Sequence, residues 1–503
     1  MKVKLIVIVP SLILALLILF IMATYGGTKI TNRQGLPAFS ALYLISVLND
    51  GPELLDPQNT ESVWQYYLLE NLSCGLIRDS KTAPSGYEGC IAEHFFQPDP
   101  NTWIFKLREI KWSDGTQVSK SDIDSWMSKL RLENSRHIQF FKQVETVVFD
   151  ENSRELRVHF RLPIANELLH ELSLADASLI PKDYKTLGWG RTVGPYYVKS
   201  WSKSNNLLLL SANKYSPFFN SQMPQEVELK QLLDSNKRSE LFKSIKIDLA
   251  LVNAMGSPHV ARTLVKNAPQ IYECHPNLIL YFNLNYKNKL AMNSVARQEF
   301  AELIKKIQIN FKPPAEDFST LRAETQMIPE GFNGRIAENT QKNELLKNVL
   351  IGHTLKIKFF SGFNENEYLL TLLRKTFADA QIKIEAEFSD DVSTQDEDNF
   401  ASLIGFAGNQ LDPSGSWSFL LFSPEAPLHP WLSEMSSKFQ SPKSGVVGRD
   451  ETFFQDLHRE VLSKHYAVPF LVGSQRYLLS DRVDASGWNR FDSRIRFYEL
   501  RMR

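Results

Sequence analysis

The sequence shows no excess of charge of either sign. Its 503 residues include 57 Lys and Arg and 57 Asp and Glu, so the formal net charge at pH 7 is zero. A protein that holds nucleic acid electrostatically needs a basic surface, and this balance does not indicate one. We therefore expect no nucleic-acid partner.

The sequence also lacks the short motifs of common catalytic centres. It contains no H-E-x-x-H, no G-x-S-x-G and no glycine-rich phosphate loop ending in G-K-[ST]. Its ten His residues are scattered, and His94, His159 and His429 are better explained as surface or core residues than as metal ligands. We therefore expect no catalytic residue, no metal and no cofactor, and we expect that the protein is not an enzyme.

Cysteine is scarce, with residues at 74, 90 and 274 only. Their spacing fits neither a metal site nor a disulfide framework. Outside the cytoplasm Cys74 and Cys90 can pair and leave Cys274 unpaired; the alternative is three free thiols. The sequence leaves the disulfide state of Cys74 and Cys90 open.

One long apolar run is present at the N-terminus. Lys2 and Lys4 precede an uncharged stretch from Leu5 to Met22, which as a helix matches the hydrocarbon thickness of a bilayer. We expect residues 1–27 to be a transmembrane anchor or a cleaved signal segment, and residues 28–41 to be a tether. Either alternative places the body outside the cytoplasm, anchored in the cytoplasmic membrane or secreted after cleavage.

The stretch from Trp103 to Met127 predicts a strand, a turn and a capped helix. Phe105 and Leu107 alternate with charged residues, which is typical of a half-buried strand. Asp114-Gly115 then predicts a tight turn, because glycine tolerates positive φ. Ser119 and Asp122 follow as a capping box, which predicts the start of a helix.

Two further patterns predict the fold class. Residues 144–161 alternate on both sides of Asp150-Glu151-Asn152 and predict a hairpin. Residues 355–360, 367–378 and 382–388 predict strand, helix and strand, an order that implies a parallel crossover. Since 503 residues exceed the size of a single core, we expect two or three lobes of α/β type.

Several short motifs resemble, in the same order, those of the peptide/nickel class of extracytoplasmic solute-binding proteins of ABC importers. The motifs are Leu55-Asp56-Pro57, Asn71 to Leu76, Ile91-Ala92-Glu93, Trp112-Ser113-Asp114-Gly115, Val193-Gly194-Pro195-Tyr196 and Asn213-Lys214-Tyr215. The resemblance covers roughly residues 42–485. It implies a periplasmic-binding-protein-like fold of several lobes, with a ligand cleft between lobes that closes about a hinge.

The resemblance also implies domain boundaries and partners. Lobe I would be discontinuous and comprise residues 42–60, 191–275 and 466–503, with lobe II at 61–190 and lobe III at 276–465. The ligand would be a small molecule, most simply a peptide, delivered to an ABC permease in the membrane. Modified peptides, metal chelates and sugars remain conceivable ligands.

The expected ligand contacts lie between Leu403 and Pro413. Relatives carry approximately G-W-x-x-D-x-x-D-P here, and the first Asp pairs with the α-ammonium of a bound peptide. Aligning Gly405 and Asp412-Pro413 places Phe406 at the Trp position and Asn409 at the Asp position. The predicted ligand-binding residues are Gly405, Phe406, Ala407 and Asn409.

Asn409 leaves two alternatives open. An amide oxygen accepts a hydrogen bond but carries no opposing charge, which weakens the expected interaction with an ammonium from about 1.5–3 kcal/mol to about 1 kcal/mol. Asn409 is then either a contact to a ligand with an uncharged or differently charged end, or a polar turn residue. The alternative function is a membrane-anchored sensor or scaffold that keeps the fold without import.

Overall fold

The chain is described from a computed structural model. It describes residues 39–42, 55, 57, 63–80, 83, 86–132, 141–161, 167–184, 188–202, 204–205, 207–230, 247–251, 270–276, 278–313, 320–330, 332, 335–336, 348–360, 366–389, 396–407, 451–488 and 494–503. None of the helices in this part of the chain is long and apolar enough to cross a membrane. The predicted anchor or signal segment, residues 1–27, lies outside the described residues.

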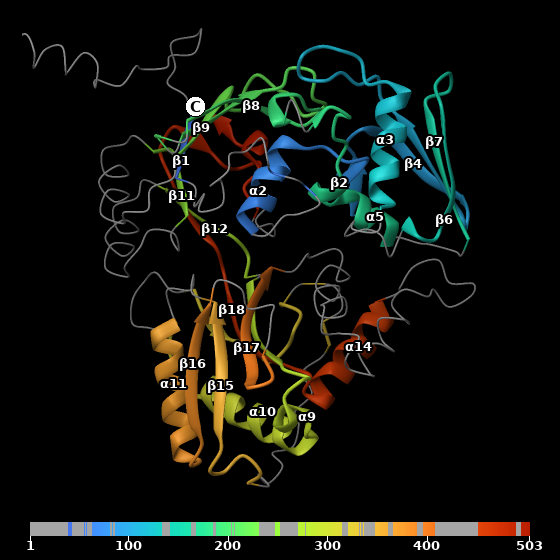
Figure 1. Ribbon diagram of the computed structural model, residues 1–503. Helices are drawn as coiled ribbons and strands as arrows, with labels where there is room; N and C mark the ends of the chain where they lie inside the picture. Colours follow the sequence, from blue (N-terminus) through green and yellow to red (C-terminus); the bar gives the residue numbers. More distant parts are fainter. Residues whose placement is uncertain are drawn as a thin grey trace, which may run out of the picture.

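Three large sheets organise the described residues (Figure 1). The upper half of the view holds lobe I beside lobe II, and lobe III lies below them. Lobe I is built on a seven-stranded sheet of order β12-β19-β11-β1-β10-β9-β8. Its strands are β1 (Phe39–Leu42), β8 (Tyr196–Ser202), β9 (Leu207–Ala212), β10 (Glu226–Lys230), β11 (Leu249–Leu251), β12 (Gln270–Glu273) and β19 (Arg476–Leu479).

Lobe II is built on an antiparallel four-stranded sheet of order β4-β5-β7-β6. Its strands are β4 (Ala92–Asp99), β5 (Thr102–Leu107), β6 (Val144–Asp150) and β7 (Glu155–Phe160), with a small ribbon of β2 (Ile77–Asp79) and β3 (Tyr87–Gly89) beside them. Its helices are α3 (Lys120–Leu130) and α5 (Glu167–Ser173). η3 (Ala175–Ala177) contributes one residue to each of the cores of lobes I and II, and η4 (Gly188–Gly190) packs through Trp189 in the core of lobe I.

The strand, turn and capped helix predicted around Trp103 are confirmed. Gly115 has a φ of +88°, as the turn requires. The Ser119 side chain accepts a hydrogen bond from the Asp122 amide, and the Asp122 side chain accepts one from the Ser119 amide. The hairpin is confirmed as well, because β6 and β7 pair antiparallel across a turn in which Asp150 accepts a hydrogen bond from the Asn152 amide.

Lobe III is a mixed six-stranded sheet of order β14-β18-β13-β17-β15-β16. Its strands are β13 (Leu278–Leu284), β14 (Arg322–Ala323), β15 (Thr354–Phe360), β16 (Lys383–Ser389), β17 (Asn399–Ala407) and β18 (Ala467–Gly473), and its helices are α9 (Lys289–Met292), α10 (Ser294–Ile309), α11 (Asn366–Asp379) and α14 (Glu451–Lys464). The predicted crossover is confirmed, since β15, α11 and β16 follow one another and the two strands pair in parallel.

Successive residues of β13 show that the lobe III sheet is covered on both faces. Leu280 and Phe282 pack in one cluster with residues of α10 and α11, whereas Ile279 and Tyr281 pack in another with residues of α14. Alternate residues of a strand point to opposite faces, so α10 and α11 cover one face and α14 the other.

Three predicted boundaries differ from the observed elements. β1 begins at Phe39, inside the expected tether, because residues 39–42 pair in parallel with β10 and β11. α2 (Val63–Leu72) was expected in lobe II, but its buried residues pack in the core of lobe I. β18 was expected in lobe I, but it pairs with β13 and β14 of lobe III. The apolar pattern of each segment predicts that it is buried but does not specify which sheet or core it packs in.

The C-terminal segment returns to lobe I. It contains β20 (Val483–Asp484), η7 (Phe497–Glu499) and β21 (Arg501–Met502), and β20 pairs antiparallel with β21. The ring of Phe497 is buried and makes edge contacts with Phe39 of β1 and Tyr196 of β8. The two ends of the described chain therefore share one core.

Candidate ligand site between the lobes

Four strands of lobe III end at the same edge of their sheet. β15 runs parallel to both β16 and β17. β17 and β18 are each antiparallel to β13, so β18 points in the same direction as the other three. The ends are Ser389, Phe360, Ala407 and Gly473, and we call this the carboxyl edge. Ligands of open α/β sheets bind outside the carboxyl ends of parallel strands. In Figure 1 this edge faces lobes I and II.

Three of the four predicted ligand-binding residues lie at the carboxyl edge. Gly405, Phe406 and Ala407 are the last residues of β17, and they pair with Leu280, Ile279 and Leu278 of β13. Asn409, which follows β17 by two residues in the sequence, lies outside the described residues. Ligand contact by these four residues stays a prediction.

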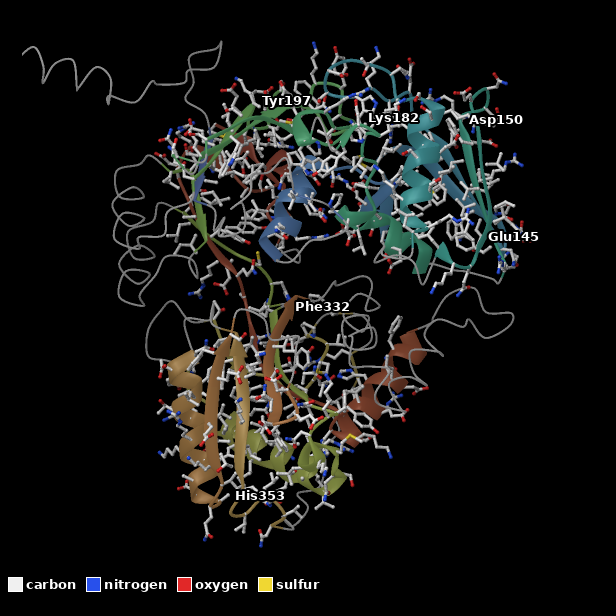
Figure 2. All side chains as sticks on the ribbon, viewed as in Figure 1. Glu145, Asp150, Lys182, Tyr197, Phe332 and His353 are labelled. Carbon is white, nitrogen blue, oxygen red and sulfur yellow. A yellow bond between two sulfur atoms is a disulfide. The ribbon has the colours of Figure 1, made fainter. Side chains whose placement is uncertain are left out.

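The chain passes between lobe I and lobe III beside the same edge. One crossing leads from β12 to β13 through Cys274, and the other leads from β18 to β19 through Gln475. The Cys274 amide donates a hydrogen bond of 2.9 Å to the Gln475 carbonyl, which joins the two crossings. The ring of Phe332, labelled in Figure 2, lies 5.9 Å from the ring of His275 on the first crossing. The carboxyl edge and both crossings are thus neighbours.

The Trp112 to Gly115 motif is structural in this protein. Asp114 forms an ion pair of 3.1 Å with Nε of Arg191, whose guanidinium also lies over the fully buried ring of Trp112. Partial burial alone would raise the pKa of the Asp114 carboxyl. The hydrogen bonds from Thr116 and the charge of Arg191 have the larger effect, so the pKa lies below its ordinary value. The motif therefore holds lobe II to the segment in which the chain returns to lobe I.

The motif around Gly194 closes the same junction. The Thr192 hydroxyl donates to the Leu72 carbonyl and accepts from the Gly194 amide at 3.0 Å. The Asn213 side chain donates to the carbonyls of Thr192 and Gly194, at 3.2 and 3.0 Å. Gly194 lies so close to Leu72 that a Cβ would come within 2.3 Å of its carbonyl oxygen. Leu72 ends α2 in the core of lobe I, and Val193 of the motif packs in the core of lobe II, so these residues lie where the two lobes meet.

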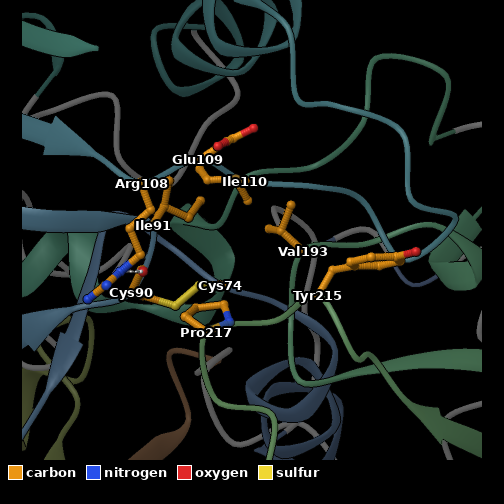
Figure 3. Close-up of a pocket in the computed structure, with 9 residues that line it drawn as sticks. All are labelled: Cys74, Cys90, Ile91, Arg108, Glu109, Ile110, Val193, Tyr215 and Pro217. Atoms are coloured by element: carbon orange, nitrogen blue, oxygen red, sulfur yellow. Dashed lines mark hydrogen bonds between the residues drawn. A yellow bond between two sulfur atoms is a disulfide. The ribbon is translucent and has the colours of Figure 1, made fainter. Parts of the chain in front are cut away.

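A small pocket lies at this junction, as Figure 3 shows. Its volume is about 170 Å³. Lobe II contributes Cys74, Cys90, Ile91, Arg108, Glu109 and Ile110, and the segments entering and within lobe I contribute Val193, Tyr215 and Pro217. The sequence prediction did not include this pocket, although Ile91, Val193 and Tyr215 belong to the motifs quoted above.

The disulfide question left open by the sequence is answered at this pocket. Cys74 and Cys90 are bonded, and Cys274 is a buried free thiol. Nε of Arg108 donates a hydrogen bond of 3.2 Å to the Cys90 carbonyl. The disulfide therefore connects the end of α2, through residue 74, to the start of the lobe II sheet.

No metal centre is apparent in the described ranges. Nowhere among those residues do three or more His, Cys, Asp or Glu side chains lie close enough together to hold a metal ion. What the described geometry provides is a sheet edge and two crossings between lobes.

The family model for bacterial extracellular solute-binding proteins, family 5 Middle, matches residues 86–426. The chain belongs to this family. No curated protein matches the sequence.

Solved structures of binding proteins share the fold. NikA from Staphylococcus aureus, in complex with Ni(L-His)2, is 14% identical with a TM-score of 0.72, over 93% of this chain and 99% of that one. The Escherichia coli murein tripeptide binding protein MppA is 12% identical with a TM-score of 0.73, over 92% and 98%. DppA from Helicobacter pylori, in complex with peptide STSA, is 15% identical with a TM-score of 0.71, over 92% and 97%. The α/β periplasmic-binding-protein-like fold is thereby confirmed.

Proposed function

We propose that this solute-binding protein encloses a peptide between lobe III and the other two lobes and delivers it to an ABC permease. The observation that supports this most directly is the position of the carboxyl edge beside both crossings. A ligand at that edge would be covered when the lobes rotate about the crossings. Binding and release require no covalent chemistry, so we propose that the protein is not an enzyme.

The peptide is favoured over other solutes by two of the structural relatives. MppA is described as a murein tripeptide binding protein, and DppA was solved with the peptide STSA. An extended peptide presents amide donors and acceptors along its length, and these need partners once the cleft excludes water. The proposed contacts are Gly405, Phe406, Ala407 and Asn409. Asn409 would accept a hydrogen bond from the peptide ammonium but would supply no negative charge to pair with it.

The family and the N-terminal apolar run support a proposal for the localisation. We propose that the uncharged run from Leu5 to Met22 inserts into the cytoplasmic membrane, with Lys2 and Lys4 inside and the lobes outside. Anchoring would keep the binding lobes near the permease. Cleavage after this run would instead release the lobes from the membrane.

A thermal unfolding experiment tests the proposal. The full chain, purified in detergent, is heated with a mixture of dipeptides to pentapeptides, with the same amino acids in free form, or with nickel and histidine. Peptide at 100 times its Kd stabilises the folded state by about 2.7 kcal/mol, so the unfolding temperature should rise by a few degrees. Mass spectrometry should recover the peptide intact.

Other results would contradict the proposal in distinct ways. Stabilisation by nickel with histidine alone would replace the peptide with a metal chelate. If mass spectrometry recovers shortened peptides, the protein cleaves them, which would contradict the proposal that it is not an enzyme. Peptide binding without peptide uptake by cells that also express an ABC permease would favour the sensor or scaffold function, which Asn409 and the proposed membrane anchor also suit.

A further inference from the structure

We propose that the hydroxyl of Thr320 restrains the hinge and thereby sets the angle between lobe III and lobes I and II. We call this restraint the pin. The inference rests on hinge closure as proposed above, but not on the identity of the ligand. Its proposed role is to position the lobes through the backbone of Ser474, to which its hydroxyl is bonded.

The crossing on which Thr320 acts is very short. β18 ends at Gly473 in the lobe III sheet, and β19 begins at Arg476 in the lobe I sheet. Only Ser474 and Gln475 lie between the two strands. Domain closure is absorbed by large changes of φ and ψ at a few residues, so any rotation of lobe III must involve this pair.

Thr320 satisfies both backbone groups of Ser474. Its Oγ1 donates to the Ser474 carbonyl at 2.7 Å and accepts from the Ser474 amide at 2.8 Å. Ser474 is 3% exposed, so water does not readily replace either hydrogen bond. Rotation of the Ser474 backbone would therefore break two hydrogen bonds to one side chain at once.

Gly473 makes room for this contact. A Cβ at Gly473 would lie 3.1 Å from Cδ2 of Leu321 and 3.4 Å from Oγ1 of Thr320. The first distance is below ordinary van der Waals contact and the second is at its lower limit, so a side chain here would crowd Leu321 and Thr320. The sequence thus places its smallest residue directly before the pinned one.

The next residue of the crossing is held from the other lobe. The Gln475 carbonyl accepts from the Cys274 amide at 2.9 Å, and its side-chain Oε1 accepts from the Tyr477 hydroxyl at 2.7 Å. Tyr477 belongs to β19 of lobe I, whereas Thr320 precedes β14 of lobe III. The boundary between the two moving bodies therefore falls between Ser474 and Gln475, and Thr320 fixes the direction in which the chain leaves lobe III.

The test measures lobe orientation without ligand. Asp150→Cys in lobe II and His353→Cys in lobe III introduce exposed labelling sites (Figure 2), while Cys274 is 1% exposed and protected from labelling. Single-molecule energy transfer between the dyes reports the distribution of inter-lobe distances in the full chain in detergent. Thr320→Val should change the ratio of lobe arrangements by about tenfold, because it removes two hydrogen bonds from one arrangement. Thr320→Ser keeps the hydroxyl and should match the wild type.

A matched control separates the pin from general destabilisation. Thr371→Val removes a hydroxyl whose hydrogen bond, to the Glu367 carbonyl, lies within α11 and away from the crossings. It should leave the distance distribution unchanged. Gly473→Ala should shift the distribution in the direction of Thr320→Val.

Two outcomes would overturn the proposal. One is a distribution for Thr320→Val identical to that of the wild type, and the other is a Thr320→Ser distribution that matches Thr320→Val. Because no ligand is present, a failure to bind peptides would not affect this result. Conversely, a negative result for Thr320 would not change the interpretation of the peptide-binding experiment.

Discussion

Arg496 and Asp79 are 417 positions apart in the sequence and form a buried ion pair, with Nη2 of the arginine 2.6 Å from Oδ1 of the aspartate. Arg494 pairs with the other oxygen of Asp79, and both arginines also contact Glu70 of α2. Arg496 further contacts Glu499 at 3.4 Å. This cluster joins the C-terminal segment to α2 of lobe I and to β2 of lobe II.

Removing the charge of Asp79 should destabilise the protein strongly. Asp79→Asn leaves two largely buried guanidinium groups with one carboxylate fewer, and breaking a buried pair costs about 3–5 kcal/mol. Urea unfolding at pH 7 measures the loss. Asp456→Asn is the control, since its ion pair with Arg459 is exposed and should contribute at most about 1 kcal/mol. Equal losses in both variants would contradict the role of the buried cluster.

The same cluster should make stability depend on acid. Burial would raise the pKa of Asp79, but the charges of Arg494 and Arg496 outweigh it and hold the pKa well below its ordinary value. A carboxyl whose pKa is lower in the folded state stabilises the protein above its unfolded pKa, which is about 3.9. That contribution is lost as the pH falls from there toward the folded pKa.

The acid dependence is measured as a difference between two proteins. The free energy of unfolding of the wild type, minus that of Asp79→Asn, should be constant near neutral pH. It should decrease steadily as the pH is lowered below about 4. A difference that is the same at pH 7 and at pH 2.5 would show that Asp79 does not titrate as described.

Gly194→Ala should damage the junction between lobes I and II. The new Cβ would lie 2.3 Å from the Leu72 carbonyl oxygen, and other hydrogen bonds hold the backbone of both residues in place. We expect a loss of about 3 kcal/mol in the free energy of unfolding. Gly190→Ala is the matched control, because the nearest atom to its Cβ is 3.8 Å away. If Gly194→Ala leaves the free energy of unfolding unchanged, the backbone at this junction can move enough to accommodate the methyl group.

Asn409→Asp should tighten the binding of peptides that carry a free amino terminus. A carboxylate would pair with the peptide ammonium, and charge-assisted hydrogen bonds exceed neutral ones by roughly 1 kcal/mol, or about fivefold in Kd. Calorimetry with a tripeptide and its N-acetylated form separates this effect, since the acetylated peptide should gain nothing. An equal gain for both peptides would place residue 409 away from the ammonium.

Local signals in the sequence were sufficient for individual elements. The capping box at Ser119 starts α3 because its hydrogen bonds join residues three apart. The strand, helix and strand order of residues 354–389 produces a parallel pair because a right-handed crossover is the favoured way to connect them. The motif resemblance identified the family, and it placed Gly405, Phe406 and Ala407 on a segment that forms the end of β17.

Partnership between distant segments was decided by the tertiary structure. The run Val-Pro-Phe-Leu-Val of β18 is apolar enough for either large sheet, and only its pairing with β13 assigns it to lobe III. The sequence left the pairing of Cys74 with Cys90 as an open alternative. The ion pair of Arg496 with Asp79 and the contact of Thr320 with Ser474 left no distinguishing pattern in it. Hydrophobic periodicity records which face of a segment avoids water, but not which surface covers it, because many surfaces offer the same burial.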